Sequence, residues 1–294
     1  MPFRKAVLSL AVLLLASVPL ALAQGTYTQI DEPNAVGQTY CYGIDTAGDI
    51  VGYYVDASRV GHGFLLSGGT YTTIDYPGSS GTLVTGMNDN GQIVGFTGST
   101  PTVGFLYDLT SQTFTTIRHP HAFQTFPYAI NNAGTIAGYY QPHQDLGVTS
   151  GFVVSKANYK TINPAGTQSS TYLTGISSST ELTGYISTIA RGFQSFLYSN
   201  GKYRDAQIPN APSAVVYGIN PTGSALVGYY HPSSNVTAGF LYESNTLQEL
   251  QFPGGTETVA YGVSSSGEVV GFFIESNGVV HGFTWTPPAD AGKK

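Results

Sequence analysis

Short apolar segments alternate with glycine-rich turns along almost the whole chain. A glycine followed by an apolar residue, as in Gly43-Ile44, returns six times at intervals of 43 to 46 residues, with alanine in place of glycine in the third copy. Eight or nine residues after each pair comes a second glycine between apolar and aromatic neighbours, first at Gly52. A fixed period of this length is typical of repeat architectures, in which each copy is one structural unit.

Two further apolar elements complete each copy. The third resembles Gly63-Phe64-Leu65-Leu66, and the fourth is a segment ending at proline, mostly led by an aromatic residue, such as residues 71–77. Asn, Asp or Ser opens the turn between the first two elements, and a glycine closes it, as expected for a tight hairpin. In the fourth copy Thr180 replaces that glycine, which predicts a strained turn. Each copy is therefore predicted to be a four-stranded antiparallel meander.

The predicted strands are apolar on both faces, as in residues 50–54. Sheets of this kind can bury both faces by stacking radially, so we predict an all-β, six-bladed β-propeller over residues 24–287. A lone strand of the fourth type, residues 27–30, begins the repeats, and a strand of the third type, residues 283–285, ends them. Pairing of these two would complete the last blade and close the ring. An open solenoid of the same meanders is the alternative.

The N-terminus has the order of a secretory signal. Arg4 and Lys5 precede an apolar run over residues 6–15, and Ala21-Leu22-Ala23 supplies small residues for cleavage. We therefore predict a signal helix over residues 1–23, and a secreted protein in the extracellular space or the periplasm. Residues 288–294 are predicted to be a disordered tail. No cysteine comes directly after Ala23 to accept a lipid, so no membrane anchor is expected after cleavage.

Composition narrows the functional classes. Only 10% of the residues are charged, and 37 glycines accompany 21 tyrosines, which excludes a coiled coil or a charged helical bundle. Removal of Arg4 and Lys5 with the leader changes the formal net charge from −6 to −8, which opposes binding to nucleic acid. The single cysteine, Cys41, cannot form an intrachain disulfide. A packed thiol is the favoured interpretation, with an intermolecular crosslink or a nucleophile as alternatives.

The repeat consensus resembles a known family. Gly-Ile, an Asn/Asp-Gly turn, Ile-Val-Gly-Tyr, Gly-Phe-Leu-Tyr and Tyr-Thr-Thr-Ile-Asp-Tyr-Pro-Gly are similar to the HAF-type extracellular repeat family of bacterial secreted proteins, over about residues 26–287. The family's histidine before the aromatic residue matches His62 and His281. The resemblance implies an exported repeat protein and does not imply a particular activity.

Candidate catalytic and metal-binding residues are few. His119, His121 and His143 could hold a metal ion together, but their loops are expected at opposite rims of a meander, so we predict solvated loop histidines instead. We predict no catalytic residues, no metal and no cofactor.

The acidic and amide residues of the repeats are mostly explained by local structure. Turn formation is the first interpretation of the residues that open the hairpins, which are Asp45, Asn88, Asn131 and Asn220. Asp31 and Asp75 each lie shortly before a proline, where a ligand and a solubilising strand end are equally compatible.

Tyrosines offer the strongest candidates for binding. A tyrosine precedes the first-element glycine, or the residue equivalent to it, in four of the six copies, at Tyr42, Tyr128, Tyr217 and Tyr261. Tyrosine combines a flat apolar ring with a polar tip, which suits contact with sugars or with a protein partner. Packing between units is the alternative role. Adjacent pairs such as Tyr53-Tyr54 should place one ring on each face of a sheet and are assigned to the core.

Three functions follow from these features. The first is a secreted, monomeric, non-catalytic propeller that binds an extracellular glycan or protein, with recognition in the loops at residues 56–62, 141–149 and 231–237. The second is an extracellular polysaccharide hydrolase or lyase that uses one mouth of the channel. The third is a structural component of a surface layer.

Overall fold

The computed structural model describes residues 25–143, 147–164, 169–188 and 192–289. These residues form 24 β-strands, and no helix occurs among them. The predicted signal helix at residues 1–23 lies outside the described residues, as does most of the predicted tail. No helix in the described part of the chain has the length and apolar character needed to span a membrane.

Four of the sheets contain four antiparallel strands in sequence order. Their strands are β2 (Thr39–Ile44), β3 (Ile50–Val55), β4 (Gly61–Ser67) and β5 (Thr70–Ile74); β6 (Thr82–Met87), β7 (Gln92–Thr97), β8 (Gly104–Asp108) and β9 (Thr113–Ile117); β10 (Gln124–Ile130), β11 (Ile136–Gln141), β12 (Ser150–Ser155) and β13 (Asn158–Ile162); and β14 (Ser170–Ile176), β15 (Leu182–Thr188), β16 (Gly192–Ser199) and β17 (Lys202–Asp205). The predicted four-stranded antiparallel meander is therefore the unit of this fold.

The fifth sheet has eight strands. They are β18 (Val215–Ile219), β19 (Ala225–Ser233), β20 (Val236–Glu243), β21 (Thr246–Leu250), β22 (Glu257–Val263), β23 (Val269–Ile274), β24 (Val280–Thr286) and β1 (Thr26–Ile30). Two antiparallel groups are joined here by one parallel bridge between Thr237 and Glu257. The β19–β20 hairpin is longer than its equivalents, so it reaches the neighbouring group. Five sheets thus appear where six units were predicted.

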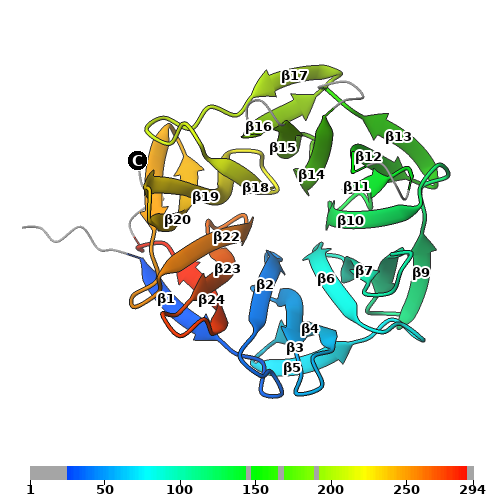
Figure 1. The fold of residues 1–294 in the computed structure, drawn as a ribbon, viewed down its shortest axis with the longest axis horizontal. Helices are drawn as coiled ribbons and strands as arrows, with labels where there is room; N and C mark the ends of the chain where they lie inside the picture. Colours follow the sequence, from blue (N-terminus) through cyan, green and yellow to red (C-terminus); the bar gives the residue numbers. More distant parts are fainter. Residues whose placement is uncertain (1–24, 144–146, 165–168, 189–191, 290–294) are drawn as a thin grey trace, which may run out of the picture.

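The sheets are arranged around a central axis, with the first strand of each unit innermost (Figure 1). Strand β1 lies along β24 in an antiparallel register that runs from Thr26 opposite Thr286 to Ile30 opposite Gly282. The first and last described strands are therefore neighbours in space.

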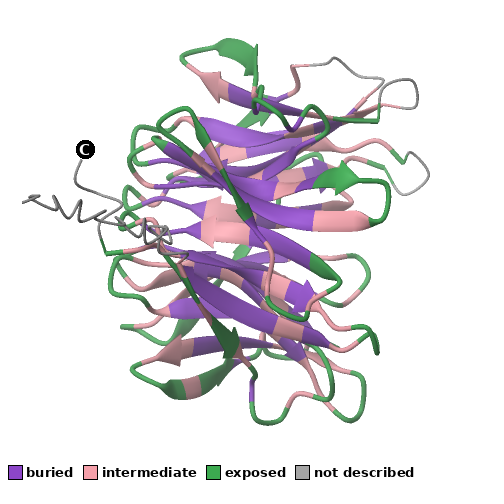
Figure 2. Cartoon of the chain, turned by 90° about the vertical axis from the view of Figure 1, so that its left-hand side faces the viewer, coloured by how far each residue is buried: buried purple, intermediate pink, exposed green. Residues whose placement is uncertain are grey.

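Burial follows the contacts between sheets, and exposed residues gather in the loops at the rims and on the fourth strand of each unit (Figure 2). Each unit contributes one fully buried phenylalanine from its third strand. These are Phe64, Phe105, Phe152, Phe196, Phe240 and Phe283. Cys41 is also fully buried, as expected for a packed thiol, and its burial raises the pKa of the thiol.

The hairpin between the first two strands contains a left-handed residue in every unit. Five of these are glycines, namely Gly48, Gly91, Gly134, Gly223 and Gly267, with φ between 71° and 86°. The sixth is Thr180, with φ of 63°, so the strained turn predicted for the fourth unit is confirmed.

Replacing Thr180 by glycine is expected to stabilise the protein by about 1 kcal/mol. A left-handed conformation costs a side-chain-bearing residue about 1–2 kcal/mol, and the greater freedom of glycine in the unfolded chain offsets part of the gain. Urea denaturation of T180G and the parent chain measures the difference. An unchanged or lower free energy of unfolding in T180G would show that this turn is not strained.

Candidate functional site

A β-bulge interrupts the pairing of the first two strands in every unit. The register shifts between Cys41 and Gly43 in the first unit, and the other five units shift at the equivalent place. A bulge leaves its extra residue unpaired and re-aims that side chain. The extra residues are Tyr42, Thr85, Tyr128, Thr174, Tyr217 and Tyr261. All four predicted tyrosines are therefore bulge residues on innermost strands.

Tyr261 contacts two of the other bulge tyrosines. The rings of Tyr42 and Tyr261 meet edge to face at 4.4 Å between centroids, and Tyr217 stacks on Tyr261 at 4.4 Å. Tyr128 lies apart from them and contacts Tyr139 at 5.4 Å. The two threonines separate Tyr128 from the others. They bond to the adjoining unit instead, since the Thr85 Oγ1 donates to the carbonyl of Pro127 at 2.9 Å and the Thr174 Oγ1 donates to that of Val216.

The bulge tyrosines remain neutral. Burial raises the pKa of Tyr42 and of Tyr261 well above the ordinary phenol value, and neighbouring phenols raise it further. Burial likewise raises the pKa of Tyr128 and Tyr217. Their hydroxyl groups are therefore hydrogen-bond donors and acceptors over the whole physiological pH range.

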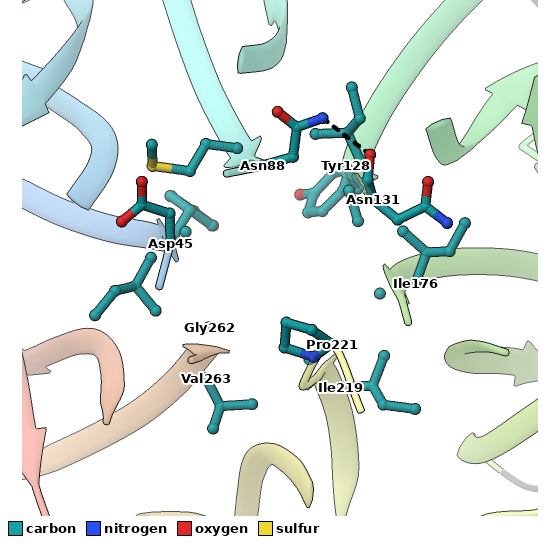
Figure 3. Close-up of a pocket in the computed structure, with 18 of the residues that line it drawn as sticks. Asp45, Asn88, Tyr128, Asn131, Ile176, Ile219, Pro221, Gly262 and Val263 are labelled. Carbon is teal, nitrogen blue, oxygen red and sulfur yellow. Dashed lines mark hydrogen bonds between the residues drawn. The ribbon is translucent and has the colours of Figure 1, made fainter. Parts of the chain in front are cut away.

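A cavity of about 100 Å³ opens on the axis beside the first hairpins (Figure 3). Tyr42, Tyr128 and Tyr261 belong to its lining, while Tyr217 does not. Between the bulge residues and the hairpins, the wall of the cavity consists of six apolar residues, one from each first strand. They are Ile44, Met87, Ile130, Ile176, Ile219 and Val263. Polar hairpin residues form the rim, including Asp45, Asn88 and Asn131 (Figure 3). The cavity is thus apolar in its middle and polar at its mouth.

The predicted turn formers do form the turns. The Asp45 Oδ1 accepts hydrogen bonds from the backbone of Ala47 and Asp49, both at 2.9 Å. Asn131 and Asn220 accept equivalent bonds in their own hairpins.

The amides also connect neighbouring units, which the sequence did not indicate. The Asn88 Nδ2 donates to the carbonyl of Asn131 at 2.9 Å, and the Asn131 Nδ2 donates to that of Ser177 at 3.0 Å. Asp89 and Asn132 exchange two further hydrogen bonds across the boundary between the second and third units. The rim of the cavity is therefore held in place by contacts between units.

Asp31 and Asp75 turn out to be partners of histidines. The Nδ1 of His62 lies 2.8 Å from the Oδ2 of Asp75, and the Nδ1 of His281 lies 2.7 Å from the Oδ1 of Asp31. A second carboxylate approaches each Nε2, from Asp56 at 3.5 Å and from Glu275 at 3.6 Å. Two units thus carry the same arrangement, and the second one connects β24 to the segment that follows β1.

His62 makes stability depend on pH. Burial by itself lowers the pKa of His62, but hydrogen bonds and charge from Asp75 and Asp56 outweigh it and raise the pKa overall. The stabilisation is therefore complete below the unfolded-state value of about 6.5 and is lost as the pH rises through the folded-state pKa. Because His62 is partly exposed, we expect a contribution below about 1 kcal/mol.

Replacing His62 by glutamine is expected to reduce the difference in unfolding free energy between pH 5.5 and pH 8.5. Denaturant titrations at the two pH values measure this difference. His231→Gln is the control, since no carboxylate of the described residues lies in ion-pair contact with this exposed histidine. Equal pH dependence in H62Q and the parent chain would contradict the assignment.

The expectation for His119 is wrong. This residue is only 4% exposed, and its ring stacks on Tyr140 at 3.7 Å. Burial lowers the pKa of His119 to about 4, so it packs as a neutral aromatic ring. His121 and His143 are exposed, as predicted. Among the described residues, no group of three His, Cys, Asp or Glu side chains is placed to hold a metal ion.

The two tyrosines of each second-strand pair differ in burial, because successive residues of a strand point to opposite faces of the sheet. Tyr54, Tyr140 and Tyr230 are buried in the core, whereas Tyr53, Tyr139 and Tyr229 are partly exposed. The prediction of one ring on each face is confirmed, but assignment of both rings to the core is wrong for the first member of each pair.

Solved structures of β-propellers are similar to this chain. AofleA from Arthrobotrys oligospora has a TM-score of 0.53 at 11% identity, covering 89% of this chain and 88% of its own. A gluconolactonase from Xanthomonas campestris has a TM-score of 0.54 at 13% identity, and the match covers 87% of this chain and 88% of the gluconolactonase. An asparagine-to-glutamine mutant of the Aleuria aurantia lectin, in complex with alpha-methyl-L-fucoside, has a TM-score of 0.53 at 15% identity. The match covers 86% of this chain and 91% of the lectin. At these identities the similarity shows the fold, which is that of a β-propeller.

No family model and no curated protein matches the sequence. The resemblance to HAF-type repeats therefore stays a prediction.

Proposed function

We propose that this chain is a secreted, monomeric, six-bladed β-propeller of the HAF-repeat type that binds an extracellular glycan or protein. The eight-stranded sheet is counted as two blades, because its two antiparallel groups share a single bridge and each has the strand order of the other units. In this count β1 is the fourth strand of the last blade, which closes the ring through β24.

One observation carries the binding role. Bulges in all six units carry one hydroxyl-bearing residue on each innermost strand, and five of the six line a cavity with a polar mouth. Concave sites with apolar walls and a few polar groups are typical of ligand binding. The small volume favours one terminal group, such as a single sugar unit or one side chain, over a long segment.

Two further features support a ligand that is not a polyanion. The formal net charge of the chain is −6, and no basic cluster occurs in its sequence. Fold neighbours include a lectin whose structure was determined with a fucoside, so the architecture is compatible with sugar binding.

A glycan array combined with a pull-down tests this function. Residues 24–294 should retain an extracellular carbohydrate or protein ligand without converting it to product. Ile176→Trp narrows the cavity from its wall and is expected to weaken a ligand bound there. Thr115→Trp, at an exposed position of the outermost strand β9, serves as the control. Failure to retain any ligand, or release of new reducing or unsaturated sugar ends, would overturn the proposal.

A further inference from the structure

A continuous set of aromatic rings crosses the fourth and fifth repeat units, formed by β14–β17 and β18–β21. Tyr172 and Tyr185 are cross-strand partners, stacked at 4.7 Å. The ring of Tyr185 meets that of Tyr217 in the next unit edge to face, with 6.0 Å between centroids. The centroids of Tyr217 and Tyr229 are 5.7 Å apart. We call these four tyrosines, with Phe193, the aromatic platform.

The platform lies toward the opposite end of the first strands from the cavity rim. In the fourth unit, the hairpin after Ile176 forms the rim, whereas Tyr172 and Tyr185 pair four residues earlier, near the beginning of β14. All four tyrosines are partly exposed residues. This site is therefore separate from the mouth of the cavity, although Tyr217 belongs to both the platform and the bulge residues.

Phe193 extends the platform into solvent. Its side chain is 52% exposed, and its ring meets Tyr185 edge to face at 5.4 Å. A large apolar side chain that stays exposed while contacting a cluster of aromatic rings is typical of a recognition surface. At the other end His231 meets Tyr229 at 5.5 Å, from one of the loops in which recognition was expected.

None of the five platform residues carries a charge, and the described groups that act on its tyrosines are uncharged too. Apart from burial, the groups that shift the pKa of Tyr185 and Tyr217 are other tyrosines. Aromatic residues elsewhere in the same two units do have acidic partners: the Tyr203 hydroxyl donates to Asp205 at 2.8 Å, and that of Tyr230 donates to Glu249. A protein partner would usually bring charged groups to such a surface and need charges to meet them at the rim.

We propose that the aromatic platform binds an uncharged oligosaccharide, with sugar rings lying on Phe193 and Tyr185 and sugar hydroxyls bonded to the phenols of Tyr217 and Tyr229. This inference rests on the proposed binding function and names its ligand class. Rings distributed over two units match a chain of several sugars better than a single one. Rigid aromatic side chains supply such contact area at a low cost in conformational entropy.

Calorimetric titration tests this assignment with neutral hexasaccharides of the malto, cello, xylo and manno series, and with a hexagalacturonate as the charged probe. At least one neutral series should bind more tightly than the charged probe. Phe193→Ala should weaken that binding about tenfold or more, because exposed aromatic anchors carry much of the affinity at such sites. Thermal stability should be unchanged, since the side chain is mostly in solvent.

Matched variants separate the platform from general effects. Tyr203→Ala removes another exposed aromatic ring from the fourth unit, 39% accessible, and should leave binding unchanged. Tyr229→Phe should weaken binding, whereas Tyr230→Phe removes a hydroxyl from the next residue, on the opposite face of β19, and should not.

The outcomes distinguish the two proposals. Absence of binding to every neutral series, tighter binding of the charged probe, or equal affinities for F193A and Y203A would overturn the glycan platform. If the pull-down then still captures a protein, the binding function stands without this ligand class. If nothing is captured either, both proposals fail.

Discussion

Replacement of Gly184 by alanine is expected to destabilise the protein by about 3 kcal/mol or more, which is at or above the usual cost of overpacking a core. A Cβ at this position would lie 1.9 Å from the carbonyl oxygen of Tyr172 and 3.0 Å from the Cα of Leu173. Both obstacles are backbone atoms of the paired strand β14, so no side-chain rotation relieves the contact. Only separation of β14 from β15 beside the bulge would make room.

Gly147→Ala is the matched control, because a Cβ there meets no described residue within 4 Å and the backbone is not left-handed. Urea denaturation of the two variants gives the comparison. The same close approach recurs at every second-strand glycine, with a Cβ to carbonyl distance of 1.8 to 2.2 Å. A cost at Gly184 no larger than that at Gly147 would contradict the proposed reason for the repeated glycine.

Replacement of Asn131 by alanine is expected to cost about 3 kcal/mol. The side chain is 5% exposed, accepts bonds from Ala133 and Thr135, and donates to the carbonyl of Ser177 in the next unit. Loss of the amide leaves several buried polar groups without a hydrogen-bond partner, and each such group costs about 1–3 kcal/mol of stability. Water that enters from the cavity can bond to some of these groups and so offsets part of the total cost. Thermal or urea unfolding measures the effect.

Two further variants divide this cost. Asn131→Asp keeps an oxygen that can form the turn but places a second acceptor oxygen against the carbonyl of Ser177, so its free energy of unfolding should be lower than that of the parent chain. Ser265→Ala changes an exposed position of the equivalent hairpin in the last unit and should stay within about 0.5 kcal/mol. Equal stability of N131D and the parent chain would show that the contact between units contributes nothing.

The repeating unit was predictable because its signals are local. Glycine positions, hairpin residues and the prolines after the fourth strands act within a few residues, so they specify a four-stranded meander and even the strained turn at Thr180. The joining of two units into one sheet was not predictable, since it depends on how far the β19–β20 hairpin extends toward Glu257.

The candidate site was predictable in part. The period placed Tyr42, Tyr128, Tyr217 and Tyr261 at equivalent positions, but only the register shift shows that they are bulge residues. Phe193 follows no repeat position, so periodicity could not select it. The stacking of His119 on Tyr140 joins the loop between β9 and β10 to strand β11, and neither the charge nor the spacing of His119 indicates that contact.

The two histidine and aspartate pairs could have been predicted from the repeat. His62 and Asp75 lie thirteen residues apart within one unit, and a search for acids near the third-strand histidine would have found them. His281 and Asp31 are the equivalent pair only if the first strand of the chain belongs to the last unit.

Hydrogen exchange resolved to single amides tests most directly the central claim that β1 completes the last unit of a closed ring. We predict that the alternate amides of residues 26–30 that face β24 open with the same free energy as the amides of residues 280–286. Exchange of residues 26–30 at the rate of an unfolded chain, while β24 stays protected, would contradict the closed ring.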